Sequence, residues 1–169
     1  MKISAVHHQP QGPAYDVVLL LHVACVVVGL ATVVASAATA TRLGKVLEAR
    51  APLPDAVVRY FRPGANWAGR ALYGIPVFGF ALLAMSHGAF GLGDGWVTAG
   101  LAIFVLVVLL AEGALWPAER RLQASLVPYG AGGTPLEPTV RRDLRTMTRS
   151  ATAALVLLIA GSVLMVAQP

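Results

Sequence analysis

The sequence predicts an all-α protein, a four-helix transmembrane bundle with both termini outside and two basic cytoplasmic loops. Of its 169 residues, 57% are hydrophobic and only 12% are charged, whereas a soluble domain has about 45–50% apolar and about 25% charged residues. Four runs are nearly free of charge, and each is long enough to cross a hydrocarbon core of about 30 Å as a helix. Strand-like alternation is absent, which favours helices over a barrel.

Each of the four runs gives one expected span in a single integral membrane domain covering residues 1–169. The first run is interrupted only by His22, and it is longer than the about 7–15 apolar residues of a signal peptide. We therefore expect a span there and not a cleaved leader. The second run contains Pro76, which is expected to kink its helix, and the third is interrupted by Glu112. The expected spans are about 16–38, 68–90, 96–117 and 148–167.

Positive charges predict the orientation. Twelve of the thirteen Lys and Arg residues lie between the first and second runs or between the third and fourth. Loops rich in Lys and Arg stay in the cytoplasm, so we expect a multi-pass protein of the bacterial cytoplasmic (inner) membrane, N-out and C-out. This topology accounts for the pI near 10, so no nucleic-acid partner is expected. The expected partner is the lipid bilayer, and the basic loops can also touch anionic lipid headgroups.

The first basic loop contains apolar residues at helical spacing between Leu53 and Phe61. This pattern predicts a short amphipathic helix on the membrane surface, ended by Pro63 and Gly64.

His22 is the clearest candidate for chemistry, because polar groups inside a membrane are costly. It begins a row of small or polar residues at helical spacing: His22, Cys25, Gly29, Thr32 and Ser36. Small residues allow helices to approach closely, and polar ones bond across the interface. We therefore expect His22 to point into the bundle.

His87 lies near the outer end of the second span, at a depth comparable to that of His22. Two histidines facing each other could hold the iron of haem b, and histidine with Met85 or Cys25 could bind copper. The alternative is that His22 bonds a backbone carbonyl and His87 sits among the headgroups. His7 and His8 form a further pair in the N-terminal tail, which could recruit copper.

Arg70 and Glu112 should lie at the same depth near the cytoplasmic ends of their spans. A structural ion pair would lower the cost of placing each charge there. A functional reading is that Arg70 holds a haem carboxylate and Glu112 relays protons.

Leu21 and His22 near the outer end of a first span, followed by a small-residue face and Gly29, resemble the copper-resistance-D-like superfamily of four-helix bacterial integral membrane proteins. The plan of four spans, two basic inner loops and a kinked second span is similar too. The resemblance is to the uncharacterised membrane-protein branch, and it implies that His22 is a haem or copper ligand.

Two classes of function remain. One is a small protein that holds haem b or copper for electron or metal handling, with His22 and His87 as ligands. The other is a non-catalytic accessory or scaffold subunit of a larger membrane complex, such as a respiratory one, or a homo-oligomer. No nucleophile–base–acid set is present in the sequence, so conventional catalysis is not expected.

Overall fold

A computed structural model describes residues 12–62, 64, 66–126 and 138–167. Within these ranges the chain is helical and contains no strand. The elements are α1 (Pro13–Glu48), α2 (Asp55–Tyr60), the 3-10 helix η1 (Trp67–Tyr73), α3 (Gly74–Met85), α4 (Gly95–Leu110), the π-helix η2 (Ala111–Leu115), α5 (Trp116–Leu126) and α6 (Pro138–Ala167). Four continuous helical stretches are long and apolar enough to cross a membrane: Pro13–Glu48, Trp67–Met85, Gly95–Leu126 and Pro138–Ala167. The prediction of an all-helical protein with four such helices is confirmed.

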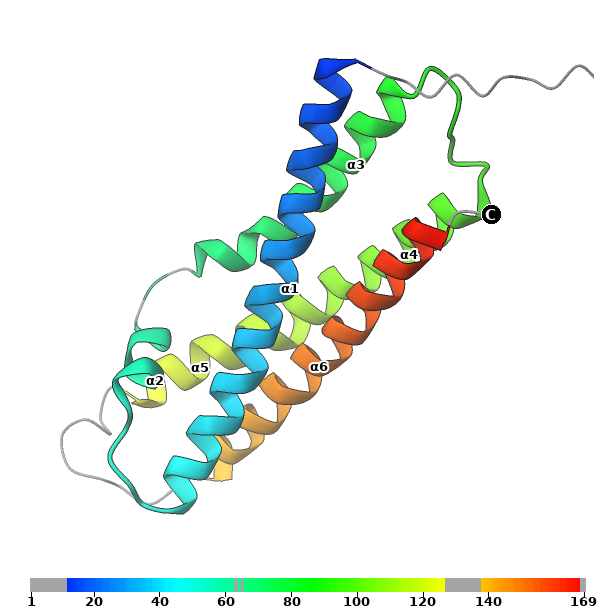
Figure 1. Cartoon of the computed structure of the whole chain (residues 1–169). Coiled ribbons are helices and arrows are strands. Elements are labelled where there is room, and N and C mark those ends of the chain that lie inside the picture. The colour runs from blue at the N-terminus through cyan, green and yellow to red at the C-terminus, as the bar shows by residue number, and fades with distance from the viewer. Residues whose placement is uncertain (1–11, 63, 65, 127–137, 168–169) are drawn as a thin grey trace, which may run out of the picture.

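α1 is the central helix of the bundle (Figure 1). It packs against α6 and against η1 and α3, while α4 packs against α6. α3 and α4 follow one another in the sequence, yet the contact between them is at most marginal. The bundle is therefore held together through α1 and α6, and it is open between α3 and α4.

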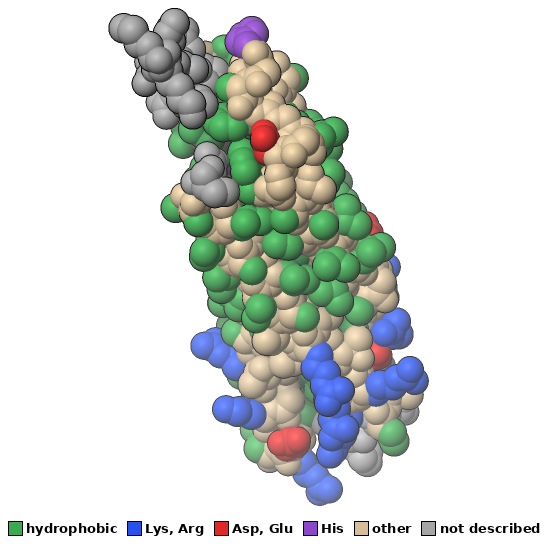
Figure 2. Space-filling view, turned by 90° about the vertical axis from the view of Figure 1, so that its right-hand side faces the viewer, with side chains coloured by type: hydrophobic (Ala, Val, Ile, Leu, Met, Phe, Trp, Pro, Cys, Tyr) green, Lys and Arg blue, Asp and Glu red, His purple; other side chains and the backbone are tan. Residues whose placement is uncertain are grey.

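Charge divides the molecule along its length. The Lys and Arg side chains gather at one end (Figure 2), which we call the basic end. The start of α1 and the end of α6 both lie away from the basic end, and the two helices diverge in that direction (Figure 1). This arrangement fits the grouping of basic residues in two loops on one side of a membrane.

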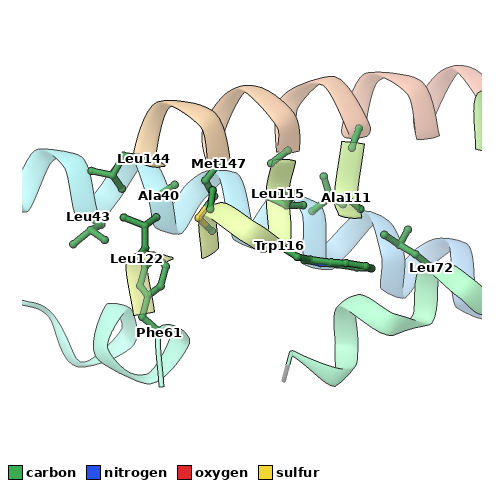
Figure 3. Packing of buried hydrophobic residues seen from close by; sticks show 14 of the residues in the cluster. Ala40, Leu43, Phe61, Leu72, Ala111, Leu115, Trp116, Leu122, Leu144 and Met147 are labelled. Carbon is green, nitrogen blue, oxygen red and sulfur yellow. The ribbon is translucent and has the colours of Figure 1, made fainter. Parts of the chain in front are cut away.

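The densest packing lies toward the basic end, where α1, α5 and α6 meet (Figure 3). Leu43, Leu122 and Met147 are fully buried there. α2 adds Val57 and Phe61 to the same cluster, so the expected amphipathic helix exists and its apolar side packs on protein. Toward the opposite end, large apolar side chains such as Leu20, which is 68% exposed, face outward. That half has the exposed apolar surface that a bilayer requires.

The second apolar stretch ends at Met85, whereas the sequence predicted a span to about residue 90. His87 and Gly88 have φ of 51° and 84°, a left-handed conformation that ends a helix. Ser86 supports this end by donating its hydroxyl to the Leu83 carbonyl at 2.7 Å. The other three helices extend beyond the expected spans, because polar turns continue them toward the basic end.

Two prolines coincide with changes of helix type. Pro76 has no N–H for the Leu72 carbonyl, and the chain just before it is a 3-10 helix, in which the Gly74 N–H bonds the Ala71 carbonyl. Pro117 likewise follows the π-helix η2, where the Trp116 N–H bonds the Ala111 carbonyl. The π turn before Pro117 is wider than an α turn, whereas the 3-10 turn before Pro76 is tighter. Each replaces α-type hydrogen bonding at the place where a proline would interrupt it. The effect of Pro76 is thus a switch from 3-10 to α-helix.

Candidate functional site

His22 lies where α1 crosses α3. Its Nδ1 atom is 2.9 Å from the carbonyl oxygen of Ile75, and its ring lies against Gly79, where an added Cβ would be 3.4 Å from the imidazole Cε1. Gly29 and Ser36 on the same row of α1 are buried, and His22 is half-buried. The prediction that this row faces the bundle is confirmed, and the glycine of α3 is what lets the ring approach.

The partner of His22 determines which ring nitrogen carries the proton. A carbonyl oxygen only accepts hydrogen bonds, so Nδ1 must be the donor. A neutral imidazole with Nδ1–H has an unprotonated Nε2. His22 therefore offers one lone pair, which can bind a metal or accept a hydrogen bond from a hydroxyl group.

An apolar cavity of about 470 Å³ adjoins His22, on the side where α3 and α4 are apart. Its walls come from α1, α3, α4 and α6 and include the aromatic rings of Phe80, Trp96 and Phe104. No Lys, Arg, Asp or Glu lines it. Its size falls in the range of about 300–1,000 Å³ found for small-molecule and cofactor sites, which are mostly apolar with a few polar groups.

The other predicted ligands lie elsewhere. His87 is exposed in the turn after α3, eight residues beyond Gly79 and past the end of the helix at Met85. Cys25 packs on α3 at Gly74, where an added Cβ would collide with its Sγ atom. Neither His87, Cys25 nor Met85 lines the cavity. The described ranges contain no group of three His, Cys, Asp or Glu side chains able to hold a metal, and His7 and His8 lie outside them.

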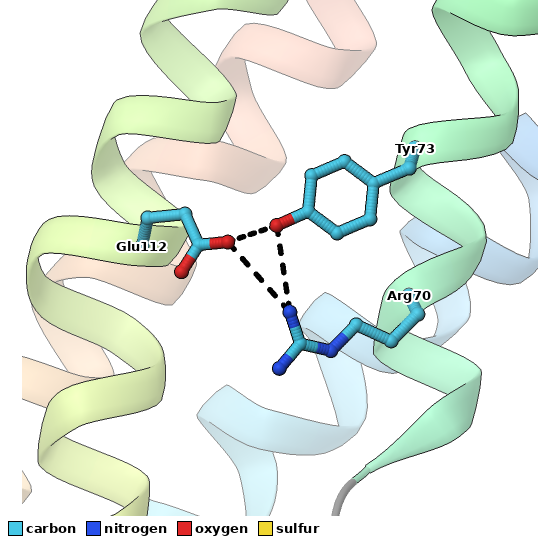
Figure 4. Close-up of polar contacts among 3 residues, drawn as sticks. All are labelled: Arg70, Tyr73 and Glu112. Carbon is cyan, nitrogen blue, oxygen red and sulfur yellow. Dashed lines mark hydrogen bonds and ion pairs between the residues drawn. The ribbon is translucent and has the colours of Figure 1, made fainter.

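Arg70 and Glu112 do form an ion pair, with Arg70 Nη1 3.6 Å from Glu112 Oε1 (Figure 4). The Tyr73 hydroxyl donates to the same carboxylate oxygen. The Arg70 guanidinium also stacks over the Trp116 ring, 4.4 Å from its centroid. The group ties η1 to η2 and α5, and none of its residues lines the cavity beside His22.

A cluster of buried polar side chains at the basic end was not predicted from the sequence. Ser36 of α1 and Tyr60 of α2 are joined by a hydrogen bond of 2.6 Å, and Glu119 of α5 is only 3% exposed. Burial raises the pKa of Tyr60 well above its ordinary value, and the charge of Glu119 raises it further. One oxygen of Glu119, Oε1, is buried with no hydrogen-bond partner among the described residues.

One signal could have identified Glu119. It lies within a row of core positions at helical spacing, with Leu115, Ala118 and Leu122, all of which are buried. A carboxylate at a core position of an amphipathic helix is unusual.

The fold and its exposed apolar surface define a multi-pass helical integral membrane protein. Comparison with known families gives the same class. A family model described as predicted integral membrane protein (DUF2269) matches residues 16–169, so the chain belongs to that family. No curated protein and no solved structure matches the chain.

Proposed function

We propose that the protein binds haem b in the apolar cavity, with His22 as the iron ligand. The bond from His22 Nδ1–H to the Ile75 carbonyl is the one that the non-ligand alternative predicts. The single observation that carries this proposal is therefore the apolar cavity of cofactor size that the His22 ring lines. A metal-binding histidine almost always donates its other ring N–H to a backbone carbonyl or carboxylate, which fixes the tautomer and raises the basicity of the ligating nitrogen.

The character of the cavity supports the same ligand. A porphyrin is flat and largely apolar, and the rings of Phe80 and Phe104 with neighbouring aliphatic side chains offer an apolar wall. A quinone carbonyl is a poorer match, because it would need a donor where His22 presents a lone pair. When bound, haem b would supply one-electron chemistry, while the protein would orient it and exclude water.

Copper held by His22 with Met85, Cys25 or His87 is the second form of this proposal, and the resemblance to the copper-resistance-D-like superfamily supports it. It is less favoured, because these three side chains do not line the cavity next to His22. The proposed setting is the bacterial inner membrane, with the basic end in the cytoplasm because of the excess of Lys and Arg there.

The test is an absorption spectrum and metal analysis of protein purified from haem-replete cells. Wild type should show a Soret band and bound iron, and His22→Ala should lose both. His87→Ala is the matched control: it removes an exposed histidine of the same half and should keep the band. Copper in place of iron would select the second form. A colourless, metal-free preparation would overturn both the haem form and the copper form of the proposal. If that metal-free protein co-purified with larger partners in mild detergent, the accessory-subunit alternative would be favoured.

A further inference from the structure

Four arginines near the start of α6 form an arginine row: Arg141, Arg142, Arg145 and Arg149. All are exposed, and together with Pro138 and Thr146 they line an open groove of about 660 Å³. Residues three, four and seven positions apart share one side of a helix. Several guanidinium groups are thus available to one ligand in this groove.

Within the part of the chain that the structure describes, no acidic side chain forms an ion pair with the row. The nearest acid in sequence, Asp143, accepts a hydrogen bond of 2.9 Å from Arg121 Nε of α5. Within the described ranges the two ion pairs are Arg121–Asp143 and Arg70–Glu112. Among the described residues, no carboxylate is paired with any of the four arginines of the row. Planar guanidinium groups match phosphate oxygens in pairs of hydrogen bonds, so a phosphate group is the natural ligand.

The same side of α6 becomes apolar immediately beyond the row. Arg142, Arg149, Val156 and Val163 follow at seven-residue intervals, so they lie on roughly one side of the helix. Val156 is 60% exposed and Val163 is 62% exposed. One surface thus offers guanidinium groups, followed by an exposed apolar strip. The first matches the phosphate headgroup of an amphiphile, and the second matches its acyl chains.

We propose that the arginine row is a binding site for an anionic phospholipid, with the headgroup phosphate on Arg142, Arg145 and Arg149 and the acyl chains along Val156 and Val163. Basic pockets at the cytoplasmic side of membrane helices bind anionic lipid headgroups in this manner. The site lies on α6 and is independent of the cavity beside His22.

The experiment is native mass spectrometry of the full-length protein in detergent, titrated separately with phosphatidylglycerol and with phosphatidylcholine. Wild type should prefer phosphatidylglycerol. The triple variant Arg142→Gln, Arg145→Gln, Arg149→Gln should weaken phosphatidylglycerol binding by at least about 10-fold, since each basic residue near a charged surface contributes about 1 kcal/mol. The matched control is Arg42→Gln, Arg59→Gln, Arg62→Gln, which removes the same charge from exposed positions of α1 and the first basic loop and should keep the preference.

Equal losses of phosphatidylglycerol affinity in the two triple variants would mean that only net charge matters, and this result would overturn the proposed lipid site. Glycerol phosphate titrated in the same way separates a lipid from a soluble phosphate: binding as tight as that of phosphatidylglycerol would overturn the lipid assignment. Size-exclusion chromatography checks folding. If the triple variant does not fold, Arg145→Gln against Arg59→Gln makes the same comparison, and equal affinities in that pair would overturn the proposal.

Discussion

The guanidinium of Arg70 stacks on the ring of Trp116, 4.4 Å from its centroid, and this contact joins η1 to the start of α5. Trp116 is 7% exposed, whereas the side chains of Arg70 and Glu112 are 37% and 45% exposed. Exposed ion pairs contribute little to stability, and a cation over a buried tryptophan contributes more. The stacking, more than the ion pair, should hold these two segments together.

Arg70→Ala is therefore predicted to lower stability by about 1–2 kcal/mol, through lost stacking and lost packing of the alkyl chain. Glu112→Gln should cost less than about 1 kcal/mol, because the glutamine oxygen can still accept from the Tyr73 hydroxyl and the stacking of Arg70 on Trp116 remains. Thermal unfolding in detergent measures both. A larger loss for Glu112→Gln than for Arg70→Ala would contradict this order.

A second prediction concerns the close approach of α1 and α3. Gly74→Ala should destabilise the protein by about 1–3 kcal/mol, because the new Cβ collides with Cys25 Sγ. Adding Cys25→Ala to Gly74→Ala should recover most of that loss. Gly113→Ala is the control, since nothing lies within 4 Å of a Cβ at that position. Unfolding midpoints compare the four proteins, and a double variant no better than Gly74→Ala would be evidence against the contact.

A third prediction concerns alkaline pH. The raised pKa of Tyr60 means that its phenol stays protonated in the fold at a pH where the unfolded chain has lost the proton. The folded state then binds more protons, so the contribution of Tyr60 to stability should be fully present below about pH 10 and be lost as the pH rises above it. Tyr60→Phe should make this fall shallower. The measurement is the unfolding free energy between pH 8 and pH 11, at roughly the ends of the tyrosine titration.

Ser36→Ala is the matched control for Tyr60→Phe. Both variants break the Ser36–Tyr60 hydrogen bond, and each should lose about 1 kcal/mol near neutral pH. Only Tyr60→Phe also removes the titrating group. An identical alkaline slope in the two variants would refute a buried, protonated Tyr60.

A fourth prediction separates ligation by His22 from a purely structural role. In His22→Ala, added imidazole should enter the space left by the ring and restore part of the Soret band expected of wild type. A structural role alone predicts lower stability and no restoration of absorbance by imidazole. Absorption spectra recorded against imidazole concentration measure the effect, with His87→Ala as a variant whose band should not respond.

Composition and hydropathy were sufficient to predict the four helices, because about twenty apolar residues in a row have few other stable arrangements. Helical spacing also predicted the buried face of α1 from His22 to Ser36, and depth alone predicted that Arg70 could reach Glu112. These features depend on periodicity and helix rise, which a sequence carries directly.

The relation of His22 to His87 could not be predicted in the same way. It depends on where α3 ends, and the left-handed turn at His87 and Gly88 ends the helix five residues before the predicted boundary. The Ser36–Tyr60–Glu119 group was missed for another reason. Its members come from three segments far apart in the sequence, and only tertiary packing brings them together.

Because α3 and α4 make only a marginal contact, the cavity beside His22 is open toward the surrounding bilayer between these two helices. An apolar molecule dissolved in the bilayer could reach His22 between these two helices without crossing water. Entry would then depend on the spacing of two helices joined by a short turn, residues 86–94, that contains Gly88, Gly91 and Gly93. If the proposed haem site is correct, shortening or stiffening that turn should change the rate at which the ligand exchanges and leave its ligation by His22 unaltered.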